Sequence, residues 1–206
     1  MPSDGPLCYI SVMRLAIVEN DPLMLKNLST LFSTEREISV VGTYASAEET
    51  LHSLSVSSPE IMIVDLGLPD RSWLGLIEQA KRTLPGLDIM AHSLFEETET
   101  LLSAIHAGAS GYLMKGTGAD AMIDAIRGLH TGRASMSTKV AQRLLEIEKQ
   151  NREVMSALNG TQRAVVSLKA EGLTSREIAD RSGLSLHDVG ACFKSIYTER
   201  QIRNWQ

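Results

Sequence analysis

Short apolar runs alternate with stretches of helical apolar spacing from residue 13 to about residue 130. The apolar runs are rich in β-branched residues and too short for helices, so they predict buried strands at 15–18, 38–44, 61–65, 87–91 and 110–114. The stretches between them predict helices that begin near Pro22, Ala47, Leu74, Glu96 and Asp120. Five strand–helix units in this order predict an α/β fold: a (βα)5 doubly wound parallel sheet with helices on both faces.

Polar residues follow the C-terminal ends of four of these runs. Glu19-Asn20-Asp21 follows the first run, Asp65 ends the third, His92-Ser93 follows the fourth and Lys115 follows the fifth. Parallel strands end at one edge of their sheet, and open α/β sheets place their chemistry at that edge. The pattern therefore predicts a site in which acids, a hydroxyl and a lysine meet.

The alternation stops at the polar segment 131–138. Residues 139–154 combine helical apolar spacing with dense mixed charge, which predicts a linker helix, with a short coiled-coil seam as the alternative. Beyond it, three capping pairs mark the starts of three short helices: Asn159 with Gln162, Thr174 with Glu177, and Ser185 with Asp188. Two short helices joined by a glycine turn are typical of a helix-turn-helix.

These patterns divide the chain into four predicted parts. Residues 1–12, with two prolines and a glycine, are expected to be a disordered extension. The α/β domain covers 13–133, the linker helix lies within 134–155, and a small all-α domain covers 156–206. The last part is mildly basic, with seven lysines and arginines against five acids.

The charge, hydrophobicity and cysteine content of the chain exclude several classes of protein. The 206 residues carry a net charge of −5, so any contact with nucleic acid must come from a local basic patch. No apolar stretch approaches the roughly 20 residues of a membrane helix, and the N-terminus lacks the features of a signal peptide. Two distant cysteines, Cys8 and Cys192, form neither a disulfide framework nor a metal cluster. We expect a cytoplasmic protein that does not bind membranes.

The chain resembles the NarL/FixJ family of two-component response regulators over nearly its whole length. In the first part the motifs are IVENDP, IVDLGLPD, HS and AGASGYLMKG, in the family's order and at its separations. In the last part, AEGLTSREIADRSGLSLHDV is similar to the family's LuxR-type helix-turn-helix. The resemblance implies a receiver domain of strand order 2-1-3-4-5 and a DNA-binding domain that controls transcription.

The resemblance also implies roles for individual residues. Asp65 would accept a phosphoryl group from a sensor histidine kinase, and Ser93, Lys115 and the switch aromatic Tyr112 would respond to it. Mg²⁺ would be held by Glu19, Asn20, Asp65 and the main-chain carbonyl of Gly67. The protein would bind promoter DNA, as a homodimer, through Thr174, Ser175, Arg176, Ser185, His187, Lys194 and Ser195. The only reactions that the protein would catalyse are its own phosphorylation and dephosphorylation. A nucleotide-binding enzyme is not expected, because no glycine-rich loop follows the first strand.

Three departures from the family pattern bear on these roles. Asn20 stands where a second metal-binding acid is usual, so we expect weaker Mg²⁺ binding. Gly190-Ala191-Cys192 replaces the usual Lys-Thr-His of the recognition helix, which removes a cation and costs about 1 kcal/mol of helix propensity. The sequence stops at Gln206, where the family adds a fourth helix, so the domain is expected to be C-terminally shortened.

Without that fourth helix, part of the small core is expected to be uncovered unless the receiver covers it. The residues concerned are Leu158, Val166, Ile196 and Ile202. The alternative function is an atypical regulator with weak or no phosphorylation and a degenerate helix-turn-helix, acting through protein–protein contacts.

Overall fold

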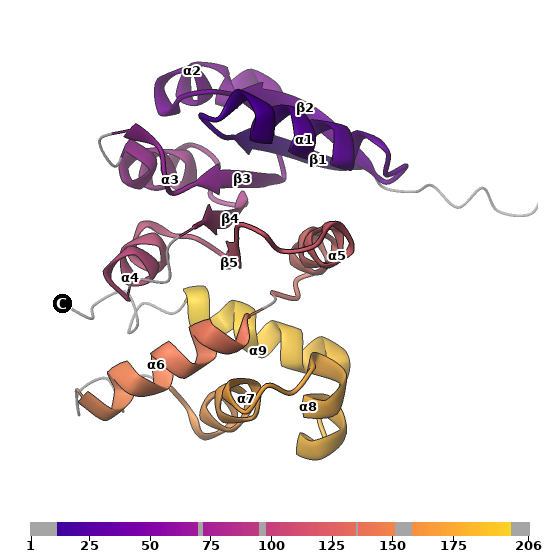
Figure 1. The fold of residues 1–206 in the computed structure, drawn as a ribbon, viewed down its shortest axis with the longest axis vertical. Coiled ribbons are helices and arrows are strands. Elements are labelled where there is room, and N and C mark those ends of the chain that lie inside the picture. The colour runs from indigo at the N-terminus through magenta and orange to yellow at the C-terminus, as the bar shows by residue number, and fades with distance from the viewer. Residues whose placement is uncertain (1–11, 70–71, 95–97, 135, 151–157, 199–206) are drawn as a thin grey trace, which may run out of the picture.

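One five-stranded parallel sheet organises the first part of the chain (Figure 1). The computed structural model describes residues 12–69, 72–94, 98–134, 136–150 and 158–198. The strands are β1 (Met13–Val18), β2 (Ile38–Tyr44), β3 (Ile61–Asp65), β4 (Asp88–Ser93) and β5 (Gly111–Met114). They pair in the order β2-β1-β3-β4-β5, which confirms the predicted parallel sheet and its strand order.

Helices cover both faces of this sheet. They are α1 (Pro22–Ser33), α2 (Ala47–Ser57), α3 (Ser72–Thr83), α4 (Thr98–Ala107) and α5 (Ala119–His130). In Figure 1, α2, α3 and α4 lie on one face, and α1 and α5 lie on the other. The central strand β3 is buried along its whole length, because a parallel sheet covered on both faces exposes neither side of its middle strands.

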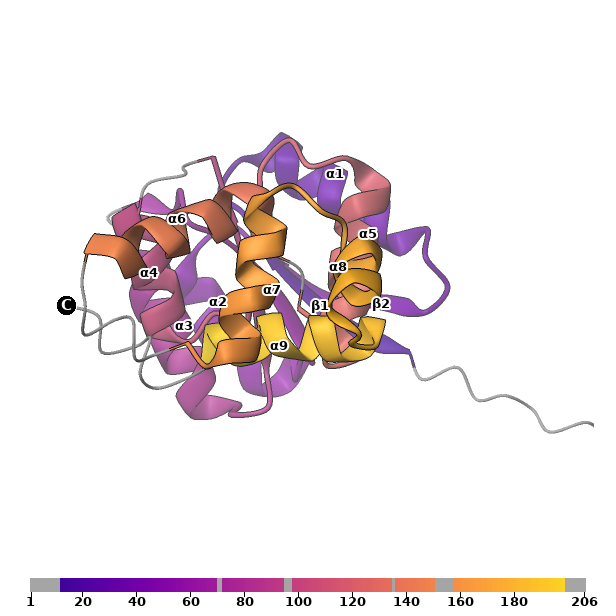
Figure 2. The ribbon, with the colours of Figure 1, turned by 90° about the horizontal axis from the view of Figure 1, so that it is seen from below.

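The described residues of the second part of the chain form the helices α6 (Thr138–Gln150), α7 (Gly160–Ala170), α8 (Ser175–Ser182) and α9 (Leu186–Thr198). Figure 1 shows α9 between the α/β domain and the helices α7 and α8, while α6 lies beside α9 near α4. Figure 2, seen from below, also shows α6 near α4. Within the described part of the chain, no helix combines the length and apolar character needed to cross a bilayer.

The predicted capping pairs begin the helices as expected. Asn159 and Gln162 exchange both hydrogen bonds of a capping box at α7, and Thr174 and Glu177 do so at α8. At α9, the Ser185 Oγ accepts from the Asp188 N–H, and the Asp188 carboxylate accepts from the Ser185 N–H. The backbone amides at these helix ends are thus paired locally.

The described part of the small core is covered, which is the outcome expected if the α/β domain lies against it. Leu158, Val166 and Ile196 are buried, and Ile202 lies outside the described residues. Two neighbours provide the cover. The helix α6 packs against α7, and its Gln142 side chain donates to the Ala170 carbonyl at 2.9 Å. The α/β domain covers the opposite side of α9.

One predicted part lies almost wholly outside the described residues, and a second lies partly outside them. Of the extension predicted at 1–12, only Val12 is described. Of the linker predicted at 134–155, the structure has a helix at Thr138–Gln150, and residues 151–157 are not described.

The role of α6 as a cover can be measured by truncating its buried face. Leu144 is fully buried, so Leu144→Ala is expected to lower the free energy of unfolding by about 2–5 kcal/mol. Leu23 is 68% exposed on α1, and Leu23→Ala is the matched control, expected to change stability by at most about 0.5 kcal/mol. Urea denaturation of both variants checks the difference, and equal small effects would show that α6 does not cover the core.

Candidate functional site

A buried ion-pair cluster lies at the C-terminal edge of the sheet. The Lys115 Nζ, just beyond β5, is 2.7 Å from the Glu19 Oε2 and 2.9 Å from the Asp65 Oδ1. Glu19 follows β1 and Asp65 ends β3, and both are almost fully buried. The neighbouring strands β1, β3, β4 and β5 thus bring together residues that are up to 96 positions apart, from Glu19 to Lys115. The predicted meeting of acids and lysine is what the structure has.

Burial and ion pairing act in opposite directions on the charges of this cluster. Burial raises the pKa of Glu19, although the Lys115 ammonium and the Asp21 N–H lower it in part. Burial disfavours the ammonium of Lys115, but hydrogen bonds to Glu19 and Asp65 raise its pKa. Lys115 is therefore charged at neutral pH, and it neutralises one of the two neighbouring carboxylates.

The turn after β3 orients the Asp65 carboxylate. The Gly67 N–H donates to the Asp65 Oδ1 at 2.8 Å. A Cβ at position 67 would lie 3.0 Å from the Asp65 Oδ2, so any larger residue would press on the second carboxylate oxygen. The Asp65 Oδ1 already contacts the Gly67 N–H and the Lys115 Nζ. The second oxygen, Oδ2, is therefore the one available to react.

The donor groups near Asp65 suit a hard cation but carry little charge. Glu19, Asn20, Asp65 and the Gly67 carbonyl offer oxygen ligands, which Mg²⁺ prefers. Asn20 is exposed beside Glu19, and its amide brings no charge. Among the described residues, no group of three or more acidic, histidine or cysteine side chains could hold a metal ion. The oxygen donors of these groups fit a Mg²⁺ ion, and weaker binding because of the neutral Asn20 stays a prediction.

Asp21 does not compensate for Asn20. Its Oδ1 accepts hydrogen bonds from the N–H groups of Leu23 and Met24, at 2.8 and 3.0 Å. It is therefore the N-cap of α1, and these two bonds lower its pKa. The carboxylate next to Asn20 in sequence is committed to the helix end.

Ser93 and Tyr112 lie on neighbouring strands with both side chains buried. Tyr112 pairs in register with Ala91, two positions before Ser93, so Ser93 and Tyr112 point to the same face of the sheet. The Ser93 carbonyl accepts from the Lys115 N–H at 2.7 Å. The Ser93 backbone thus lies beside Lys115, and the roles of the Ser93 hydroxyl and of Tyr112 stay predictions.

His92 is a buried residue to which the sequence assigned no role. It pairs in register with Asp65, so its imidazole lies on the same face of the sheet as the Asp65 side chain. Neither ring nitrogen has a hydrogen-bond partner among the described residues. Burial, and to a lesser degree the Lys115 charge, lowers the pKa of His92 to about 4. The sequence did carry a signal, since His92 directly follows the apolar run at 87–91.

The predicted DNA-contacting residues fall into two groups. Thr174, Arg176, Ser185 and His187 are exposed near the starts of α8 and α9, and Ser175 is half-buried there. Lys194 and Ser195 instead face inward. The Lys194 Nζ is 2.8 Å from the Asp88 Oδ2 of β4, and the Ser195 Oγ accepts from the Gln162 side chain at 3.0 Å. Lys194 and Ser195 are thus turned toward other parts of the molecule, and the exposed Thr174 and Ser185 cap their own helices.

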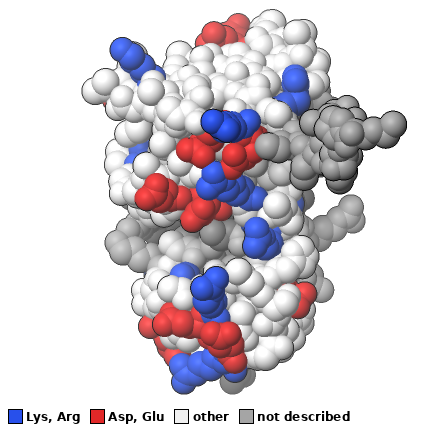
Figure 3. Space-filling view, turned by 90° about the vertical axis from the view of Figure 1, so that its right-hand side faces the viewer, with Lys and Arg blue, Asp and Glu red and all other residues white. Residues whose placement is uncertain are grey.

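Charge is interspersed on the face that carries α5 and α8 (Figure 3). Acidic and basic side chains alternate down this side of the molecule, and no wide basic surface forms there. The Arg127 guanidinium on α5, for example, pairs with Glu35 at 2.7 Å and also with Glu37. A basic surface for nucleic acid is thus not presented on this face.

Comparison with known proteins identifies the family of the first part of the chain. The family model of the response regulator receiver domain matches residues 15–127. The chain belongs to the response regulator receiver family. The strands and helices of the matched segment are those that carry Glu19, Asp65, Ser93 and Lys115. We therefore refer to the segment from β1 to α5 as the receiver.

Relatives extend the match beyond the receiver. The DNA-binding transcriptional activator DevR/DosR of Mycobacterium tuberculosis is 27% identical over 179 residues, covering 84% of this chain and 82% of that protein. The response regulator protein VraR of Staphylococcus aureus is 23% identical, covering 93% of this chain and 92% of its own length. These matches confirm that the chain is a NarL/FixJ-type response regulator.

Solved structures agree on the fold. A two-component response regulator of the LuxR family from Aurantimonas sp. SI85-9A1 superposes with a TM-score of 0.62 and 26% identity, over 68% of this chain and all of that one. RcsB of Salmonella typhimurium superposes with a TM-score of 0.61 and 19% identity, over 95% of this chain and 98% of that one. The second match covers both parts of the molecule, so the arrangement of a receiver followed by helices is a known fold.

The unpaired His92 predicts an acid-sensitive receiver. The unfolded chain binds a proton at His92 near pH 6.5, whereas the folded chain binds it only near pH 4. Between these values the unfolded state binds more protons, so the free energy of unfolding falls as the pH falls, by about 3 kcal/mol at most.

Urea denaturation at pH 7 and pH 5 measures this loss. We expect His92→Leu to reduce the loss between the two pH values, and the exposed His187→Gln to retain it. If His92→Leu loses as much stability as the parent protein, the acid sensitivity arises elsewhere.

Proposed function

We propose that this protein is a transcription regulator whose receiver is phosphorylated on Asp65 by a sensor histidine kinase. The observation that carries the proposal is the Lys115 ammonium held between Glu19 and Asp65 at the sheet edge. Phosphoryl transfer depends mainly on positioning and on neutralising charge, and this cluster provides both beside a carboxylate nucleophile.

In this proposal the Asp65 Oδ2 attacks the phosphorus of the kinase phosphohistidine. The new O–P bond forms as the N–P bond breaks, and the imidazole leaves with the electron pair. Glu19, Asn20, Asp65 and the Gly67 carbonyl would hold a Mg²⁺ ion, which would neutralise charge on the phosphoryl oxygens. The Lys115 ammonium already contacts Asp65, so it is placed to pair with a phosphoryl oxygen, and Ser93 is placed to donate a hydrogen bond.

The output is DNA binding through α8 and α9. The helix-turn-helix and the relatives that bind DNA support this part of the proposal. In the structure, however, one face of α9 packs against the receiver through Lys194 and its neighbours. A recognition helix reaches base edges in the major groove only when that face is free, so binding requires α9 to separate from the receiver. Two separated copies would match a two-fold related operator.

A regulator that acts through protein contacts is the second candidate. Asn20 weakens the metal site, and Gly190 removes a cation from the recognition helix. The two candidates differ in salt dependence, because neutralising DNA phosphates releases counterions and gives a steep loss of affinity with salt.

The deciding experiment is a pulldown of sheared genomic DNA by the purified protein, at low and moderate salt, with and without beryllium fluoride and Mg²⁺. We expect enrichment of discrete fragments that grows with beryllium fluoride and declines with salt. Asp65→Asn, which cannot bind beryllium fluoride in the same way, is expected to lose the increase and keep the basal binding. No enrichment under any condition would favour the protein-contact candidate.

The weak metal site predicts a gain from restoring its charge. We expect Asn20→Asp to lower the Mg²⁺ concentration for half-maximal phosphorylation by acetyl phosphate by roughly tenfold, equal to about 1.4 kcal/mol. The added phosphoryl mass on Asp65, measured by intact-protein mass spectrometry, checks it. Asp21→Asn is the matched control and is expected to leave this concentration nearly unchanged, since Asp21 caps α1.

A further inference from the structure

A cavity of about 250 Å³ lies between the receiver and the helix α6. Leu101 of α4 and Tyr112 and Met114 of β5 form its wall on the receiver side. The residues on the other side are Ser137, Val140, Gln142, Arg143 and Glu146. Segments that are far apart in the sequence thus build one hollow where the two parts of the chain meet, and small molecules bind preferentially at such boundaries.

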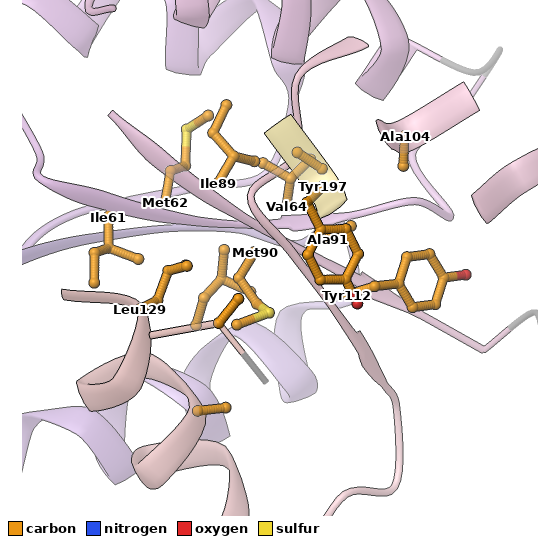
Figure 4. Close-up of a cluster of buried hydrophobic side chains, with 14 of the residues drawn as sticks. Ile61, Met62, Val64, Ile89, Met90, Ala91, Ala104, Tyr112, Leu129 and Tyr197 are labelled. Carbon is orange, nitrogen blue, oxygen red and sulfur yellow. The ribbon is translucent and has the colours of Figure 1, made fainter. Parts of the chain in front are cut away.

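The apolar side of this cavity is well packed, and its volume limits what could enter. Leu101 and Val140 are almost fully buried, and Tyr112 is 2% exposed. Tyr112 belongs to the cluster of buried side chains drawn in Figure 4, so its neighbours hold the ring in place. A volume of about 250 Å³ equals about eight water molecules at roughly 30 Å³ each. It is smaller than the sites of drug-sized ligands and suits a molecule of about ten non-hydrogen atoms.

Polar and charged groups line the α6 side of the cavity. The Arg143 guanidinium pairs with the Glu146 carboxylate, three residues further along the helix. Ser137 adds a hydroxyl, and the Gln142 amide is held by its hydrogen bond to the Ala170 carbonyl at 2.9 Å. Among the described residues that line the cavity, the charged ones are one cation and one anion, so this lining has no net charge.

The ion pair on α6 restricts the charge of a ligand. A carboxylate without a positive group would be attracted by Arg143 but repelled by Glu146, and an ammonium without a negative group would meet the reverse. A zwitterion avoids both repulsions, because its carboxylate can pair with Arg143 while its ammonium pairs with Glu146. An apolar side chain on that zwitterion would be buried against Leu101, Met114 and Val140.

We propose that this cavity binds a free apolar α-amino acid, held by the Arg143–Glu146 pair at its charged end and by the receiver wall at its side chain. Met114 of that wall directly precedes Lys115, and the resemblance implies a switch role for Tyr112. A ligand that packs better against one arrangement of β5 than against another shifts the balance between them. This effect on signalling rests on the proposed function, whereas the binding itself is independent of DNA and of phosphorylation.

The test is a titration of the full-length protein, isotope-labelled at its methionine methyl groups and observed by NMR. The Met114 methyl signal, assigned by its loss in Met114→Leu, is expected to shift and saturate as L-leucine is added in the millimolar range. Isocaproate is leucine without the ammonium group, and isoamylamine is leucine without the carboxylate. Both are expected to bind roughly tenfold more weakly than leucine, because each leaves one charge of the ion pair without a ligand partner.

Variants of the ion pair test the assigned contacts. Arg143→Gln is expected to weaken leucine binding roughly tenfold and to strengthen the binding of isoamylamine, since the repelling cation is gone. Glu146→Gln is expected to weaken leucine binding and to strengthen the binding of isocaproate. A variant that merely lost its structure would not exchange its ligand preference in this way. Arg82→Gln is the matched control, because Arg82 also pairs with a glutamate of its own helix, Glu78 at 3.2 Å, and does not line the cavity.

The outcomes separate this inference from the proposed function. A Met114 signal that does not shift with L-leucine or L-phenylalanine at about 10 mM would overturn the amino-acid site. Equal binding of leucine, isocaproate and isoamylamine would also overturn it, because the ion pair would then play no part. A leucine-dependent shift that persists in Asp65→Asn would support the site whether or not the receiver is phosphorylated. Failure of the genomic DNA pulldown alone would therefore count only against the transcription regulator.

Discussion

The buried pairing of Lys115 with Glu19 and Asp65 is the interaction on which the rest of this molecule depends. Charges removed from water are tolerated only when they are paired, and removing one partner from such a group is strongly destabilising. Here one ammonium serves two carboxylates on separate strands, so the site retains a single excess negative charge. A metal ion and a phosphoryl group would each interact with this excess negative charge. The charge lies beside the strands that carry Ser93 and Tyr112.

The connection from this edge of the sheet to the recognition helix is short. Tyr112 lies on β5, which is the edge strand next to α9, and Tyr197 packs into the same buried cluster. Cores packed at this density do not deform continuously, so a rearrangement of one ring requires its neighbours to repack. A docked α9 and a released α9 are therefore better described as two discrete arrangements than as a gradual loosening. A phosphoryl group biases such a pair of states only through contacts that differ between them.

The sequence predicted most of the strands and helices because their signals are local and repeated. Apolar strands that end in Asp65 and Lys115, and capping pairs such as Thr174 with Glu177, each specify their own structure. The cover of the small core could not be predicted in the same way. Leu158 and Ile196 are buried by α6 and by the receiver, which are contacts between parts of the chain that no periodicity connects. His92 was visible as a polar residue in an apolar strand, but only the register with Asp65 gave it a neighbour. Lys194 was assigned to DNA from its residue type, and its partner Asp88 is 106 positions away.

Gly190 shows why a departure from a family pattern must be weighed against the whole fold. Considered alone, a glycine in the middle of a helix is a defect that costs about 1 kcal/mol relative to alanine. In the structure the same residue lets two backbones approach closely enough for the Gly190 carbonyl to accept from the Ala134 N–H, where an alanine methyl would overlap Arg133. The loss in helix propensity is of the same order as the net stabilisation from one hydrogen bond. The burial of Tyr197 and the Lys194–Asp88 pair then further stabilise the docked state, because glycine introduces no steric overlap at position 190. A residue that weakens the isolated helix can in this way stabilise the assembled protein.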